Sequence, residues 1–110
     1  MYKPRWGAFF ETPLEAHLRE CDISTVVLCG FNFPNCPRTS IYEASERDFR
    51  VVAVTDGISG LYERGARELE AIGVALLGTA DVITAIRELA LGPSRRRMKT
   101  SSALSLSVSL

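Results

Sequence analysis

Cys36 is the side chain of this sequence in the setting that best suits a nucleophile. A mostly apolar run ends at Gly30, a short loop follows, and Cys36 stands six positions later, where a helix is expected to begin. Free backbone N–H groups and the positive end of the helix dipole favour the thiolate, which is the nucleophilic form of cysteine. We therefore predict that Cys36 is a catalytic nucleophile, whereas Cys21 and Cys29 are expected to be small buried hydrophobic residues.

The loop before Cys36 has features that would serve acyl chemistry. Ligands of doubly wound α/β folds bind outside the carboxyl ends of the strands, and Cys36 follows such an end closely. Pro37 fits the first turn of a helix, where no N–H donor is lost. We expect the backbone N–H groups of Asn35 and Cys36 to remain free and to point at a developing oxyanion.

The elements that must position this loop alternate between helix and strand. Helical spacing of apolar residues predicts helices over residues 13–21, 38–47, 61–72 and 80–91, and short β-branched runs predict strands over residues 25–29, 49–55 and 74–77. Alternation with short connections implies parallel strands and right-handed crossovers, with helices on both faces of the sheet. The predicted fold class is therefore α/β, a three-layer α/β/α arrangement on a partial Rossmann-like parallel sheet of about three strands.

The chain of 110 residues forms at most one small domain, which we assign to residues 1–92. The composition changes after that point, because a basic cluster is followed by serine alternating with apolar residues. We predict that residues 93–110 form a disordered tail rich in Ser and Arg, and the alternation leaves an additional strand open as the second interpretation. Without such a strand, the first predicted strand would have an open edge.

Charge and composition exclude several function classes. The formal net charge of zero argues against a nucleic acid or a membrane surface as partner. No apolar stretch approaches the ~20 residues of a membrane span, and the N-terminus lacks the apolar core of a secretory signal. The three cysteines show no CxxC spacing and there is no His cluster, so we expect no disulfide framework, no metal site and no cofactor. These features favour a cytoplasmic protein that acts on a small-molecule substrate.

A second residue able to do chemistry lies near the start of the chain. Lys3 precedes Cys36 by 33 positions, and the small-aromatic-x-x-Thr-x-Leu pattern of residues 8–14 stands between them. A buried strand leads into the Gly-x-x-x-x-x-Cys loop, and a further strand runs into Asp56. In this order and spacing, residues 3–90 resemble the C-terminal portion of the isochorismatase-like cysteine hydrolase superfamily.

The resemblance implies a fold, a reaction and a set of site residues. Members of the superfamily are three-layer α/β/α proteins that cleave small amides or, in some cases, vinyl ethers, and the amidases use an Asp-Lys-Cys triad. Carried over, Cys36 would be the nucleophile and Lys3 the cationic partner that favours its thiolate. A cis peptide bond that helps to form the oxyanion hole would fall at Phe31–Asn32.

One departure from the family pattern concerns the general base. That Asp normally lies on a strand upstream of the Lys, and only Met1 and Tyr2 precede Lys3. We therefore expect a hydrolase domain whose N-terminal part is missing, cleaving a C–N bond through a thioester on Cys36 with impaired activity. The resemblance does not name the substrate.

Two alternatives of other classes remain open. The chain could be a non-catalytic remnant that associates through its open sheet edge with a complementing chain or with a second copy. It could also be a regulatory protein that uses the reactivity of Cys36 without hydrolysis.

Further polar and aromatic residues have structural interpretations. Asp56 is expected to end a strand and to hold its own turn. His17 is expected to pack in the core or along a helix surface, and the aromatic residues Trp6, Phe9 and Phe10 are expected to form core or pocket wall.

Overall fold

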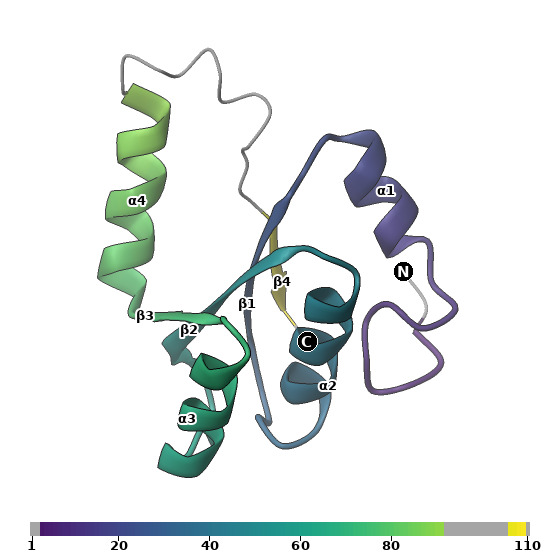
Figure 1. Cartoon of the computed structure of the whole chain (residues 1–110), viewed down its shortest axis with the longest axis horizontal. Coiled ribbons are helices and arrows are strands. Elements are labelled where there is room, and N and C mark those ends of the chain that lie inside the picture. Colours follow the sequence, from purple (N-terminus) through teal and green to yellow (C-terminus); the bar gives the residue numbers. More distant parts are fainter. Residues whose placement is uncertain (1–2, 92–105, 110) are drawn as a thin grey trace.

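The computed structural model describes residues 3–91 and 106–109. Its helices are α1 (Leu14–Glu20), α2 (Cys36–Glu46), α3 (Glu63–Ala71) and α4 (Thr79–Leu91), and its strands are β1 (Thr25–Gly30), β2 (Arg50–Ile58), β3 (Ala75–Leu77) and β4 (Leu106–Ser109) (Figure 1). The order of helices and strands up to residue 91 is the predicted one. None of the helices in this part of the chain is long and apolar enough to cross a membrane.

The strands form one parallel sheet in the order β3-β2-β1-β4. Strand β1 pairs with β2 so that Val26 lies opposite Val51 and Leu28 opposite Ala53. The predicted α/β class with a parallel sheet is confirmed. The structure adds a fourth short strand to the expected three.

The main core lies on one face of the sheet, because alternate residues of a strand point to opposite sides. Val26, Leu28 and Ala53 face this side and are fully buried. The side chains that cover them come from three helices and are contributed by Leu14 and Leu18 of α1, Ile41 and Ala44 of α2, and Leu69 of α3. This packing holds α2, and therefore Cys36 at its start, rigidly against the sheet.

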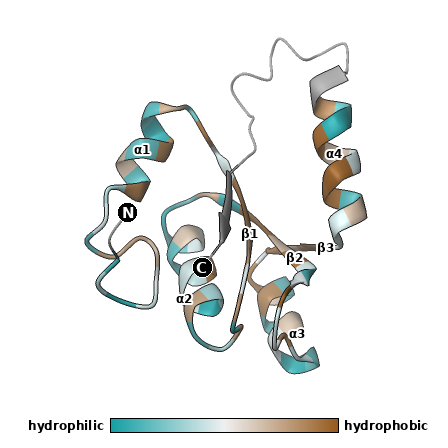
Figure 2. Cartoon of the chain, turned by 180° about the vertical axis from the view of Figure 1, so that it is seen from behind, coloured by the Kyte–Doolittle hydropathy of each residue, from teal (hydrophilic) through white to brown (hydrophobic). Residues whose placement is uncertain are grey.

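Helix α4 covers the other face of the sheet. Its side chains Val82, Ile83 and Ile86 line a pocket of about 250 Å³ together with Val27 and Cys29 of β1. Figure 2 shows apolar residues on α4 and along β1, β2 and β3. With helices on both faces, the described part of the chain has the predicted three layers.

Strand β4 corrects the prediction for part of the tail. We expected residues 93–110 to be disordered, but Leu106–Ser109 pairs in parallel with β1, with Leu106 opposite Val26 and Ser109 opposite Cys29 (Figure 1). The edge of β1 that we expected to be open is therefore occupied along these residues. An edge strand presents a row of unpaired N–H and C=O groups, which an extended segment can satisfy. The remainder of the predicted tail lies outside the described residues.

Strand β2 is longer than predicted, which changes the role of Asp56. The strand continues to Ile58, so Asp56 lies within it and does not end it. Its Oδ1 accepts hydrogen bonds from the backbone N–H and the hydroxyl of Thr79, each at 2.8 Å. Asp56 thus holds the start of α4 and not its own turn. The two hydrogen bonds, that from the hydroxyl first, hold the pKa of the Asp56 carboxyl below its usual 3.8.

Candidate active site

Cys36 is the first residue of α2 and follows the carboxyl end of β1 after a short loop. Its side chain is half-buried. Pro37 occupies the first turn of α2, as predicted. The backbone N–H of Cys36 has no backbone hydrogen-bond partner among residues 3–91 and 106–109, as is usual for the first N–H groups of a helix.

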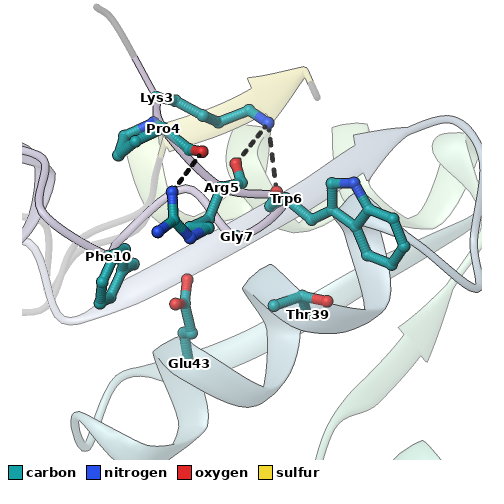
Figure 3. A pocket seen from close by; sticks show the side chains of 8 residues that line it. All are labelled: Lys3, Pro4, Arg5, Trp6, Gly7, Phe10, Thr39 and Glu43. Carbon is teal, nitrogen blue, oxygen red and sulfur yellow. Dashed lines mark hydrogen bonds between the residues drawn. The ribbon is translucent and has the colours of Figure 1, made fainter.

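The structure brings Lys3 to Cys36 across 33 positions of sequence. The Lys3 Nζ lies 3.7 Å from the Cys36 Sγ. The same ammonium donates hydrogen bonds to the carbonyl oxygens of Arg5 at 3.1 Å and Trp6 at 3.2 Å (Figure 3). An ammonium has three N–H donors, and these three partners account for them. These three contacts therefore hold the ammonium beside the sulfur.

The loop between β1 and α2 contains the cis peptide bond that the family resemblance implied. The bond lies at Phe31–Asn32. The loop is anchored to the end of β2, because the Phe33 N–H donates to the Ser59 carbonyl at 2.8 Å and the Ser59 N–H donates to the Gly30 carbonyl at 3.1 Å. Phe31 itself is 70% exposed and packs little against this framework.

Gly60 allows the next connection to approach this loop closely. A Cβ added to Gly60 would lie 2.5 Å from Oδ1 of Asn32, and the glycine has a φ of +75°, which other residues rarely adopt. The absence of a side chain at Gly60 therefore leaves room for the side chain of Asn32.

One predicted oxyanion donor is not available. The Asn35 N–H donates to the Asn32 carbonyl at 2.9 Å, so the expectation that it is free is wrong. The backbone folds back tightly over these residues, and a tight turn satisfies its own donor. The Cys36 N–H is the one of the two predicted backbone donors without a backbone partner in the described residues.

Lys3 lines a pocket of about 650 Å³, and Figure 3 shows the side chains around it. It is lined by Lys3, Pro4, Arg5, Trp6, Gly7, Phe10, Thr39 and Glu43. Trp6 and Phe10 expose their rings, whereas Phe9 is buried in the core. The guanidinium carbon of Arg5 is 5.4 Å from the centre of the Phe10 ring. Lys3 belongs to both the pair and the pocket, whereas Cys36 does not line it.

Helix α2 contributes two further polar residues that we did not predict as part of the site. The Ser40 Oγ accepts a hydrogen bond from the Ala8 N–H, and the Glu43 Oε1 accepts one from the Phe9 N–H, both at 2.9 Å. The sequence spacing of Ser40 and Glu43 could have pointed to them, because residues four and seven positions after Cys36 lie on the same side of a helix as Cys36. Both bonds hold the N-terminal segment that carries Lys3.

His17 and Cys21 lie on the solvent side of α1. Both side chains are exposed, and the His17 Nε2 is 3.9 Å from the Cys21 Sγ. The expectation that Cys21 is a buried hydrophobic residue is wrong, because Leu14 and Leu18 occupy the buried face of this short helix.

Among residues 3–91 and 106–109, no carboxylate forms a hydrogen bond or an ion pair with Lys3 or Cys36. No group of three or more His, Cys, Asp or Glu residues in this part of the chain is arranged to hold a metal ion.

Comparison with known families and structures agrees with this geometry. The isochorismatase domain family matches residues 1–87. An isochorismatase-like hydrolase from Alkaliphilus metalliredigens is similar in structure, with a TM-score of 0.70 and 28% identity over 76% of this chain and 48% of that protein. The N-carbamoylsarcosine amidase from Thermoplasma acidophilum gives a TM-score of 0.62 and 26% identity over 69% of this chain and 45% of that protein.

Curated sequences show the same likeness over shorter segments. An uncharacterized isochorismatase family protein, YwoC, of Bacillus subtilis is 37% identical over 57 residues, which are 52% of this chain and 30% of that protein. A protein of Arabidopsis thaliana called "probable inactive nicotinamidase" is 34% identical over 55 residues, 49% of this chain and 28% of that protein. The matched segments thus span less than a third of these curated relatives.

Proposed function

Because the chain belongs to the isochorismatase family, we propose that it is a cysteine hydrolase that cleaves the C–N bond of a small amide through a thioester on Cys36. The observation that carries this proposal is the 3.7 Å approach of the Lys3 Nζ to the Cys36 Sγ. The attacking species is the cysteine sulfur in its anionic form, and the Lys3 ammonium lies where its positive charge would stabilise negative charge at that sulfur during the reaction.

The reaction then follows ordinary acyl chemistry. The Cys36 sulfur attacks the carbonyl carbon of the amide, a C–S bond forms, and the carbonyl electron pair moves onto oxygen. The Cys36 N–H at the start of α2 stabilises this oxyanion. Collapse of the intermediate breaks the C–N bond, and the nitrogen leaves as the amine after taking up a proton. Water then cleaves the thioester, releasing the carboxylic acid and restoring the thiol.

The substrate class is a small amide that fits beside the pair. Two relatives of known structure are named as amidases: an N-carbamoylsarcosine amidase and a nicotinamidase. The pocket of about 650 Å³ offers the exposed rings of Trp6 and Phe10 and the charged side chains of Arg5 and Glu43. These groups would hold a compact polar molecule with a flat portion.

We expect turnover by this chain alone to be slow. A general base usually contributes about 10²–10⁴ in rate, and no carboxylate among the described residues contacts the pair. Three cysteines, an odd number without CxxC spacing, fit a reducing compartment, so we place the protein in the cytoplasm.

The test is amide hydrolysis by the purified chain. We would measure ammonia release from nicotinamide and from N-carbamoylsarcosine, together with an acyl adduct on Cys36 by mass spectrometry. Slow release should disappear in Cys36→Ala and persist in Cys21→Ala, which removes an exposed thiol outside the site. Equal rates in wild type and Cys36→Ala would exclude the proposed nucleophile.

A second candidate is a non-catalytic module that associates with a second copy or a complementing chain. The absence of a carboxylate at the pair in the described residues favours it, as does the Arabidopsis relative whose name calls it inactive. Such pairing through β1 would have to displace β4. Light scattering that shows a defined oligomer, combined with no amide turnover, would support this candidate over the hydrolase.

A further inference from the structure

We infer that Ser40 and Glu43 are positioning residues, which hold the N-terminal segment on α2 so that the Lys3 ammonium stays beside the Cys36 sulfur. This inference rests on the proposed roles of Lys3 and Cys36. Neither Ser40 nor Glu43 contacts the thiol in the described hydrogen bonds, so each acts through Lys3.

Ser40 forms the inner of the two contacts. Its side chain is fully buried, although serine is usually exposed. A buried hydroxyl needs a partner, and here its Oγ accepts the hydrogen bond from the Ala8 N–H at 2.9 Å. Removing the hydroxyl would leave the Ala8 N–H buried without an acceptor, because Ala8 itself is only 1% exposed.

Glu43 forms the outer contact one turn further along α2. Its Oε1 accepts the hydrogen bond from the Phe9 N–H at 2.9 Å, and its side chain lines the pocket (Figure 3). The carboxylate also lies against the backbone of Gly7, with a position for a Cβ only 2.7 Å from Oε2. The absence of a side chain at Gly7 therefore leaves room for the Glu43 carboxylate in the position where it accepts from the Phe9 N–H.

One rigid element thus carries both the nucleophile and the contacts that place its cation. Cys36, Ser40 and Glu43 are separated by four and three positions, so they lie along one side of α2. A helix keeps such spacings nearly fixed. The distance between ammonium and sulfur therefore depends on how the segment containing Lys3 sits on α2, and not on the long flexible side chain of Lys3 alone.

The ammonium is tied to the same segment by its own hydrogen bonds. It donates to the carbonyl oxygens of Arg5 and Trp6, which directly precede Gly7 in the chain. If the segment lifts from α2, those carbonyl oxygens move and take the ammonium with them. Loss of either contact on α2 should therefore move the Lys3 ammonium away from the Cys36 sulfur and lower the reactivity of that thiol.

The reactivity of the Cys36 thiol reports this effect directly. We would measure the rate of alkylation by iodoacetamide at pH 7 and follow each cysteine by peptide mapping. Cys21 is exposed and serves as the internal reference in every variant. Lys3→Met defines the full effect of the cation, which we expect to be a slowing of Cys36 by about fivefold or more.

The variants separate positioning from general stability. Ser40→Ala and Glu43→Leu should slow Cys36 by a factor approaching that of Lys3→Met. Glu43→Gln keeps an acceptor oxygen for the Phe9 N–H, so it should retain most of the wild-type rate. In the Lys3→Met background, Ser40→Ala and Glu43→Leu should have little further effect, since there is no cation left to misplace. Circular dichroism would verify that each variant is folded. If Ser40→Ala does not fold, Glu43→Leu tests the positioning role by itself.

Two outcomes would overturn the inference while leaving the proposed function intact. In the first, Lys3→Met slows Cys36 but Ser40→Ala and Glu43→Leu do not. In the second, the same variants slow Cys36 equally with and without Lys3, which would mean a merely structural role. If Lys3→Met itself leaves the Cys36 rate unchanged, the Lys3–Cys36 pair of the proposed function fails, and this inference fails with it.

Discussion

The backbone of Gly7 packs against the carboxylate of Glu43, and a Cβ on Gly7 would lie 2.5 Å from the Glu43 Cδ. Real Cβ atoms do not approach other atoms so closely, so one of the two groups must move if Gly7 gains a side chain. The Glu43 carboxylate is the end of a flexible side chain, so it is the group that would move, and it would then give up its hydrogen bond from the Phe9 N–H.

Replacement of Gly7 by alanine should disturb this contact. We expect Gly7→Ala to lower the free energy of unfolding by about 0.5–1.5 kcal/mol, because the Glu43 side chain can swing away but then loses its hydrogen bond from the Phe9 N–H. Urea denaturation of the variant would measure the change. Gly78→Ala is the matched control, since a Cβ there would have its nearest neighbour at 3.9 Å, an ordinary contact. Similar losses in both variants would contradict the role of the Gly7 contact.

The hydrogen bonds from Thr79 to Asp56 should make the stability depend on pH. They hold the pKa of Asp56 below its unfolded value, so the carboxylate stabilises the folded state above about pH 3.9. That contribution is lost as the pH falls through the lower folded value. Asp56→Asn should therefore reduce stability more at pH 7 than at pH 3, as measured by urea denaturation at both values.

Asp22→Asn is the control for this experiment. Asp22 is an exposed aspartate in the turn after α1 and lies apart from the start of α4. If the stability of both variants changed with pH in the same way, the change would be due to the altered net charge and not to loss of the Asp56–Thr79 hydrogen bonds.

The fully buried Leu28 in the centre of β1 should be essential for the core. It is 0% exposed and faces the side of the sheet that α1, α2 and α3 cover. Truncation to alanine leaves a cavity, so Leu28→Ala should lower the free energy of unfolding by about 2–5 kcal/mol. Leu89→Ala removes the same atoms from a side chain of α4 that is 44% exposed and should cost much less.

The exposure of Cys21 predicts its chemistry in the native protein. Cys21 is at the end of α1 with an exposed thiol, whereas Cys29 and Cys36 are half-buried. A disulfide reagent such as Ellman's should modify Cys21 without unfolding, and Cys21→Ala should remove that phase. Persistence of the same phase in Cys21→Ala would assign the accessible thiol elsewhere.

The sequence by itself determined the order and type of the elements up to residue 91 and the start of α2 at the loop that carries Cys36. These features depend on local causes: the period of apolar residues, β-branched runs and the placement of Pro37. The spacing of Lys3 and Cys36 could be read as a family pattern, and the cis bond at Phe31–Asn32 came with it. The resemblance to the family therefore predicted the Lys3–Cys36 pair and the cis bond, which the local periodicity of the sequence does not predict.

The tertiary structure alone decided the contacts between residues far apart in the chain. It showed that β4 pairs with β1, that Asp56 holds Thr79, and that Ser40 and Glu43 bind the segment before α1. It also showed that the Asn35 N–H is consumed by the Asn32 carbonyl. Each of these depends on which backbone groups remain unpaired after folding, and that is settled by the packing of the whole chain and not by any local stretch of sequence.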